Sequence, residues 1–312
     1  MKKAPVVILL ACISLLCSCN KFSIGDIVDE TRHLDTTFQI VEIRDDIDVS
    51  LQHCTPEMKA GTIYIKTGEN LIDGINAQME EYLETEGDDT VKFTKLIISN
   101  DNSQSYLRPY NHTPQMTLYY DTIYKIIFHS NARNIRTDTL RGYNFKTHFT
   151  ANDTIEWDSL VPNLLIEVEG GSGNFNVLTN CYKLIAKYIH GTSTLNLKGK
   201  ATLASTYADY DCHGIINSKD LDTHIYYVTT YGTNIIKTRA YHLLDVKNGN
   251  IGEVHYLKYI TNREEYVWND SLHQTDTVIK TIISPEVVRY NEEYINIWTY
   301  NNEIQGLVKE LP

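Results

Sequence analysis

The chain has 312 residues and a formal net charge of −12 at pH 7, with 40 Asp and Glu against 28 Lys and Arg. Nucleic-acid binding requires clustered Lys and Arg that replace the counterions of the phosphates, and the sequence contains no such cluster. A nucleic-acid partner is therefore excluded. The 22 tyrosines and plentiful Thr favour strands, prolines number only 7, and Asn, Asp and Gly favour turns, so we expect a mostly β fold.

The N-terminus has the pattern of an export signal that ends in a lipidation site. Two lysines at residues 2–3 precede an apolar run over residues 4–15, which is shorter than the ~20 residues of a membrane-spanning helix. Residues 16–19 read Leu-Cys-Ser-Cys, so a small residue precedes Cys19, as lipoprotein processing requires. We predict that Cys19 is lipidated.

This interpretation divides the chain into a signal peptide over residues 1–18, a tether over 19–33 and one domain over 34–312. No second apolar stretch of membrane-spanning length follows Cys19. We therefore expect the lipid to attach the protein to the membrane, and the localisation to be the cell envelope, as an outer-membrane lipoprotein. Whether it faces the surface or the periplasm is left open.

Residues 75–86 fit both a helical and a strand pattern. Helical spacing relates Ile75, Met79, Tyr82 and Leu83, whereas strict alternation relates Ile75, Ala77 and Met79. We favour a strand followed by an acidic turn, and residues 96–98 then read as the next strand.

From residue 164 to residue 256 the chain repeats about every 20 residues. One register holds an apolar residue in each repeat: Phe175, Leu195, Ile215, Ile235 and Val254. A second register holds Leu164-Ile166-Val168, Leu184-Ala186-Tyr188, Ala204-Thr206-Ala208, Tyr226-Val228 and Leu244-Val246. Small or turn-forming residues separate the two registers in every repeat.

Such a period, with short alternating strands and polar corners, indicates a β-solenoid whose apolar rows stack about 4.8 Å apart. A two-sheet sandwich is the competing fold, because short strands at similar spacing also suit it. Two polar stretches, at about residues 134–162 and 258–282, interrupt the pattern, and we expect both to project as insertions. The N-terminal strands and residues 294–307 are expected to cover the ends of the solenoid.

Several segments resemble the auto-transporter adhesin head domain, also called the GIN domain, of Bacteroides-type bacteria. The similar segments, in chain order, are residues 41–43 followed by 47–51, then 68–72, 106–108, 116–120, 195–221 and 285–288. The resemblance implies a right-handed parallel β-helix on a secreted or lipid-anchored protein with no established activity. The family's Ser-Gly-rich corners are kept only at residues 171–173.

The remaining cysteines of the mature chain are Cys54, Cys181 and Cys212, and none has the CxxC or Cys/His spacing of a zinc site. Three cysteines cannot all pair within one chain. We expect buried free thiols, with a Cys181–Cys212 disulfide as the alternative.

The densest ionisable group comprises His190, Asp209, Asp211 and His213. A 20-residue coil would place His190 near Tyr210 and would stack Ser193, His213 and Thr233. Paired carboxylates beside an imidazole suit acid–base chemistry or a metal, but such residues commonly bond the backbone at corners, which is the interpretation we favour. The sequence has no Ser/His/Asp elbow, phosphate loop or HExxH motif, and we expect neither an enzyme, a cofactor nor a metal.

Two further sets of residues are candidates for surface roles. Tyrosines on a solenoid face either form cross-strand ladders or stack on sugar rings: Tyr119, Tyr120, Tyr124, Tyr226, Tyr227, Tyr231, Tyr256 and Tyr259. Eight tripeptides in which an apolar residue or Thr follows Asp-(Ser/Thr) resemble the O-glycosylation acceptor of Bacteroides-type bacteria, at Thr36, Thr90, Thr122, Thr139, Thr154, Ser159, Ser271 and Thr277. We predict that two or more of the eight are modified.

Together these features predict a non-enzymatic, lipid-anchored β-solenoid of the cell envelope that acts as an adhesin or binds a glycan or protein. The solenoid would display its insertions and an aromatic face away from the membrane. A periplasm-facing structural or assembly factor is the alternative, and a carbohydrate-active enzyme is a more distant one.

Overall fold

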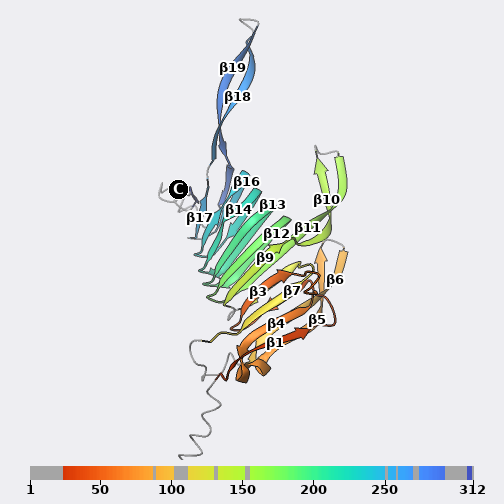
Figure 1. The fold of residues 1–312 in the computed structure, drawn as a ribbon. Helices are drawn as coiled ribbons and strands as arrows, with labels where there is room; N and C mark the ends of the chain where they lie inside the picture. Colours follow the sequence, from red (N-terminus) through yellow and green to blue (C-terminus); the bar gives the residue numbers. More distant parts are fainter. Residues whose placement is uncertain are drawn as a thin grey trace, which may run out of the picture.

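The computed structural model describes residues 24–86, 89–101, 112–129, 133–151, 155–249, 252–257, 259–269, 274–291 and 308–310. The expected signal peptide and Cys19 lie outside these ranges. Of the strands in these ranges, 19 join into one large curled sheet, and two form a separate hairpin (Figure 1). The expected all-β class is confirmed. No helix within these ranges has the length and apolar composition needed to cross a membrane.

The strands of the large sheet are, in chain order, β1 (Ile27–His33), β2 (Ile40–Ile43), β3 (Asp48–His53), β4 (Thr62–Gly68), β5 (Ile75–Glu86), β6 (Asp89–Asn100), β7 (Gln115–Tyr120), β8 (Lys125–His129), β9 (Asn134–Leu140), β10 (Tyr143–Ala151), β11 (Ile155–Glu169), β12 (Asn174–Gly191), β13 (Thr194–Cys212), β14 (Ile215–Thr230), β15 (Ile235–Thr238), β16 (Ala240–Asn248), β17 (Glu253–Tyr256), β20 (Glu286–Asn291) and β21 (Val308–Glu310). The separate hairpin consists of β18 (Tyr259–Asn269) and β19 (Gln274–Ser284). A short 3-10 helix (Glu69–Gly74) joins β4 to β5. The predicted strand over residues 75–86 is confirmed.

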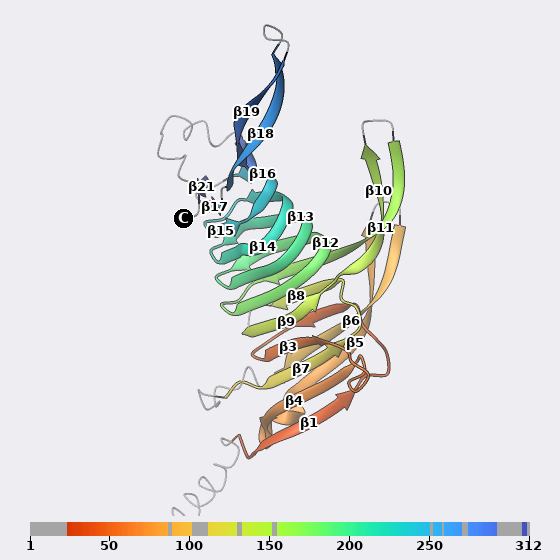
Figure 2. The ribbon, with the colours of Figure 1, turned by 45° about the horizontal axis from the view of Figure 1, so that its top comes forward.

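The long strands β12, β13 and β14 lie side by side in parallel, and each runs through most of one repeat (Figure 2). Phe175 pairs with Leu195, which follows it by 20 residues in the sequence. Burial alternates along these strands, as expected where one face covers a core and the other meets water. Phe175 stacks on Phe128 of β8 with ring centroids 4.3 Å apart, so side chains from the two halves of the coils meet in one core.

The second apolar register was predicted correctly, but the first was wrong by one residue in two repeats. Ile216 and Ile236 continue the buried row after Leu195, and both are fully buried. Their neighbours Ile215 and Ile235 are only half-buried. The reason is one extra residue near the end of β13, where Tyr188 pairs with Ala208 but His190 pairs with Asp211. Because side chains alternate with a period of two, one extra residue exchanges the two faces of the strand that follows.

The sheet is mixed rather than uniformly parallel. β4 pairs antiparallel with both β1 and β7, and β5 pairs antiparallel with β6. Only two residues separate β5 from β6, and a connection this short allows a hairpin but no crossover to a parallel neighbour. The expectation of a continuous stack of parallel coils is therefore wrong for the N-terminal part of the domain. The right-handed winding of the coils stays a prediction.

An antiparallel hairpin lies within each expected insertion. β10 pairs with the first part of β11, and β18 pairs with β19; both hairpins project from the curled sheet (Figure 1). The first insertion was placed too early, because β9 at its N-terminal end pairs in parallel with β3 and β12 as part of the main sheet. Residues 294–307, expected to cover one end, lie outside the described residues.

A second, smaller apolar cluster lies apart from the main core. It combines residues of the two hairpins β5–β6 and β10–β11 with residues of β2, β11 and the β7–β8 region: Ile40, Phe93, Tyr124, Ile127, Phe145 and Leu165. Phe93 stacks on Tyr124 with centroids 4.9 Å apart. This packing fixes the two hairpins against the sheet.

Candidate functional site

Four neighbouring strands, β7, β3, β9 and β12, present a row of polar side chains on the outer face of the sheet. Their register aligns Thr117, Ser50, Arg136 and Asn176. The preceding residue on each strand is buried in the core: Met116, Val49, Ile135 and Phe175. Because side chains alternate along a strand, the aligned polar residues point outward.

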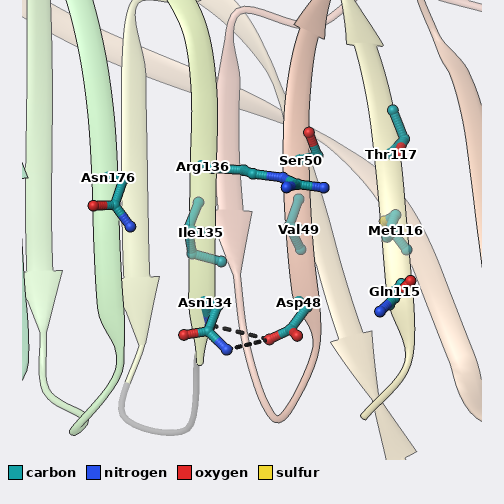
Figure 3. A pocket seen from close by; sticks show the side chains of 10 residues that line it. All are labelled: Asp48, Val49, Ser50, Gln115, Met116, Thr117, Asn134, Ile135, Arg136 and Asn176. Carbon is teal, nitrogen blue, oxygen red and sulfur yellow. Dashed lines mark hydrogen bonds between the residues drawn. The ribbon is translucent and has the colours of Figure 1, made fainter.

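A hollow of about 250 Å³ lies over this row. Figure 3 shows the side chains that line it. Asp48, Gln115 and Asn134, two positions earlier on their strands, complete its polar lining. Asp48 Oδ1 accepts hydrogen bonds from the Asn134 backbone nitrogen at 3.2 Å and from its Nδ2 at 3.0 Å. These two bonds hold the Asp48 carboxylate in place.

Arg136 supplies the cation of the hollow. Its exposed side chain extends across the sheet toward Ser50 on β3 (Figure 3). Within the described ranges, no ion pair or hydrogen bond engages its guanidinium, whereas nearby Arg133 pairs with Asp46. A guanidinium carries five donors in a planar fork that suits carboxylates and paired hydroxyl oxygens.

The same row continues over the following coils. Asn176 aligns with Asn196, Asn217, Lys237 and His255. The amide nitrogen of Asn196 donates to the Asn176 side-chain oxygen at 3.2 Å, and that of Asn217 donates to Asn196 at 3.0 Å. We name as the polar column the eight aligned residues Thr117, Ser50, Arg136, Asn176, Asn196, Asn217, Lys237 and His255. Seven steps between adjacent strands give it a length of roughly 34 Å.

The polar column offers hydroxyls, amides and two basic side chains at a regular spacing. The amide ladder orients Asn176, Asn196 and Asn217 before any ligand arrives, which lowers the entropic cost of binding. The chain is acidic as a whole, but charges farther than about 8 Å are largely screened at physiological ionic strength. The local charges, Arg136 beside Asp48 and Lys237 farther along the column, therefore dominate what the column attracts.

The predicted ionisable group does not form a site. His190 aligns with Asp211, and both are exposed. Asp209 accepts a hydrogen bond from the backbone of Tyr210 at 2.8 Å, and His213 Nδ1 lies 2.6 Å from Thr233 Oγ1. The Asp209 contact is the backbone hydrogen bond expected of a corner residue, whereas His213 contacts a side chain.

Two details of that prediction were wrong. His190 aligns with Asp211 rather than Tyr210, because the register shifts after Tyr188. Ser193 does not stack with His213: it is fully buried, and its hydroxyl lies 2.8 Å from the Tyr188 hydroxyl.

The predicted tyrosines do not share one face. Tyr120 and Tyr226 are buried, and Tyr124 packs in the second apolar cluster. The side chain of Tyr259 is not described. On the outer surface, Tyr231 stacks on Tyr210 with centroids 5.1 Å apart, and Tyr207 approaches the same ring; neither of these partners was predicted.

The three described cysteines are free thiols, so the alternative Cys181–Cys212 disulfide is wrong. Cys181 and Cys212 are buried, as expected. Cys54 is only half-buried, because it follows the end of β3 at the sheet edge.

The glycosylation motifs remain predictions. Thr36, Thr90 and Thr139 are exposed, whereas Thr122 and Ser159 are partly buried. Thr277 lies on β19, and Thr154 and Ser271 lie outside the described residues.

Comparison with known proteins places the chain in a family. The family model described as "Putative auto-transporter adhesin, head GIN domain" matches residues 37–258. The chain belongs to this family. The match spans the large sheet from β2 to β17, including all the residues of the polar column.

Solved structures share the family's fold with this chain. A "putative adhesin" from Bacteroides fragilis is 14% identical with a TM-score of 0.56, covering 92% of this chain and 97% of its own. A "putative lipid binding protein" from Parabacteroides distasonis is 12% identical with a TM-score of 0.52, covering 92% and 98%. No curated protein matches the chain.

The polar column is not among the sites predicted from the sequence, although part of it has a sequence pattern. Asn176, Asn196 and Asn217 each directly follow an apolar residue of the repeat, at intervals of 20 and 21 residues. Repeated amides at one position of a solenoid predict an outward ladder. The position of Arg136 beside them has no such signal, because β9 precedes the repeats and joins them only through the register with β12.

Proposed function

We propose that this protein is a non-enzymatic, lipid-anchored component of the cell envelope that binds a hydroxyl-rich glycan along the polar column. Family membership and the lipidation motif at Cys19 support the envelope location. The observation that carries the binding proposal is the continuity of Arg136, whose guanidinium has no partner among the described residues, with the amide ladder of Asn176, Asn196 and Asn217.

A glycan suits this surface for a chemical reason. Sugar hydroxyls both donate and accept hydrogen bonds, and the polar column offers both kinds of group: its hydroxyls and amides donate and accept, and Arg136 and Lys237 donate. The lipid ligand suggested by the name of the Parabacteroides distasonis protein fits less well, because a lipid tail needs an apolar cavity and the outer side chains that line the hollow are polar.

A glycan array followed by calorimetry tests the binding proposal. Arg136→Ala is expected to weaken the selected glycan at least about tenfold, since a hydrogen bond to a charged group contributes about 1.5–3 kcal/mol. Asn196→Ala is expected to weaken it less, through loss of the ladder. Lys198→Ala is the matched control, because Lys198 is exposed on β13 two residues beyond Asn196. Equal affinity of all three variants and the parent would refute the proposal.

The location is tested separately. Cys19→Ala is expected to release the chain from membranes or to leave the precursor unprocessed, and unchanged fractionation would contradict lipidation. Protease treatment of intact cells, with a periplasmic protein as control, then distinguishes a surface adhesin, which is cleaved, from a periplasm-facing assembly factor, which is protected.

A further inference from the structure

Three potential metal ligands meet where β3 and β7 end. His53 and Tyr120 are the last residues of these parallel strands and are Cα partners in the register. The Cys54 backbone nitrogen then donates to the Tyr120 carbonyl oxygen at 2.7 Å, so the next residues, Cys54 and Asp121, lie side by side. Ligand atoms of His53, Cys54 and Asp121 all lie within 4.8 Å of one another.

Two of the three side chains, those of His53 and Asp121, are oriented by a contact outside the group of ligand atoms. His53 Nδ1 lies 3.0 Å from the Cys54 carbonyl oxygen, which favours a proton on Nδ1 and leaves the lone pair on Nε2. Asp121 Oδ2 accepts from the Thr122 hydroxyl at 3.4 Å, while Oδ1 faces Cys54 Sγ at 4.0 Å. Hydrogen bonds to the remaining groups of metal ligands are typical of metal sites, because they fix the ring and carboxylate orientations.

We propose that His53, Cys54 and Asp121 bind a zinc ion, with a fourth position open to water. A thiolate, an imidazole and a carboxylate form a borderline-soft donor set that suits Zn²⁺ and disfavours Mg²⁺ and Ca²⁺, which prefer oxygen ligands alone. On binding, the Cys54 thiol loses its proton to solvent and its sulfur donates to the metal; no oxidant or reductant takes part.

The geometry needs little adjustment for a tetrahedral ion. Typical Zn–S and Zn–O bonds of about 2.3 and 2.0 Å place the sulfur and oxygen about 3.5 Å apart, against 4.0 Å here. His53 and Asp121 are exposed and Cys54 is half-buried, so side-chain rotation can close the remaining distance. The site is distinct from the polar column, whose residues on β3 and β7 are Ser50 and Thr117, three residues before His53 and Tyr120.

Cobalt titration of the full chain tests the site, with Zn²⁺ as competitor. The protein, purified in detergent and stripped with a chelator under reducing conditions, is expected to bind one equivalent of Co²⁺ with a thiolate-to-metal charge-transfer band that Zn²⁺ removes. Cys54→Ser is expected to abolish the band, and His53→Ala or Asp121→Asn to weaken Zn²⁺ binding at least about tenfold. The double variant Asp209→Asn with His213→Ala is the control, since it removes similar exposed groups elsewhere.

Alkylation of Cys54 in the folded parent protein provides a second measurement that does not depend on the folding of a variant. Loss of the band after alkylation, with the melting temperature of the metal-free protein unchanged, supports the site. Absence of the band in the parent protein, its persistence after alkylation or in Cys54→Ser, or an equal loss of affinity in the control would each overturn the proposal.

Discussion

Tyr226→Phe removes one hydroxyl from the centre of the repeat core. The Tyr226 hydroxyl lies 2.8 Å from Thr206 Oγ1, one coil earlier, and 2.9 Å from Ser218 Oγ, in the other half of its own coil. All three side chains are buried, with at most 1% of their surface exposed. The hydroxyl therefore joins adjacent coils and also the two halves of one coil.

The expected loss of stability depends on which hydrogen bonds Thr206 and Ser218 retain in the variant. Ser218 still donates to the Lys237 carbonyl oxygen at 2.7 Å, whereas no acceptor other than Tyr226 is described for the Thr206 hydroxyl. Two net hydrogen bonds of about 1 kcal/mol each, with part of the penalty for a buried unpaired donor, give about 2–3 kcal/mol. A chain of this size has an unfolding entropy of about 0.6 kcal/mol/K, so that loss lowers the melting temperature by about 3–5 °C.

Urea denaturation followed by circular dichroism measures this loss. Tyr227→Phe is the matched control, because Tyr227 is the neighbouring residue but is 42% exposed, and it is expected to change the stability by less than about 0.5 kcal/mol. Adding Thr206→Val to Tyr226→Phe is expected to recover part of the loss, since it removes the unpaired donor. Equal stability of Tyr226→Phe and Tyr227→Phe would refute the described core.

Three further predictions concern a corner, the thiols and acid stability. Gly199→Ala is expected to lower the free energy of unfolding by about 2–4 kcal/mol, because Gly199 has φ +100° and a Cβ would lie 2.1 Å from a carbonyl oxygen of the preceding coil. Thermal unfolding measures this loss of stability. In the folded chain a maleimide is expected to label Cys54 rapidly, and Cys181 and Cys212 only slowly, because burial raises their pKa values to about 11 and about 12; mass spectrometry counts the labels. Burial alone would raise the pKa of Glu42, but hydrogen bonds from basic side chains hold this pKa well below its usual value. The ionised Glu42 therefore contributes stability above about pH 4.5, and this contribution falls as the pH drops further. Glu42→Gln is expected to flatten the decline in a pH series of urea titrations.

Three results would contradict these predictions. They are an unchanged melting temperature for Gly199→Ala, equal labelling rates for all three thiols, and an acid profile of Glu42→Gln that parallels the parent below about pH 4.5.

The N-terminal strands show why the chain order did not reveal their neighbours. β2 lies between β6 and β8, and β3 lies between β7 and β9, so early strands insert between later ones. Alternation along β2 and β3 predicts strands but carries no information on which strand each one pairs with. The hollow beside Ser50 and Arg136 depends on that pairing and was not predictable from local pattern.

The sequence by itself determined the all-β class and the second buried register, because these depend on side-chain alternation and on a repeat of about 20 residues, both of which are local. It also determined the family, through the resemblance of several short segments. Only the tertiary structure decided that Ile216 rather than Ile215 faces the core, since one residue added in a corner exchanges the two faces of a strand. Only the tertiary structure places Arg136 beside the amide ladder. Only it brings together Asp121 and Cys54, since these two residues lie 67 positions apart in the chain. Such contacts arise from strand pairing over long sequence distances, and no local pattern encodes them.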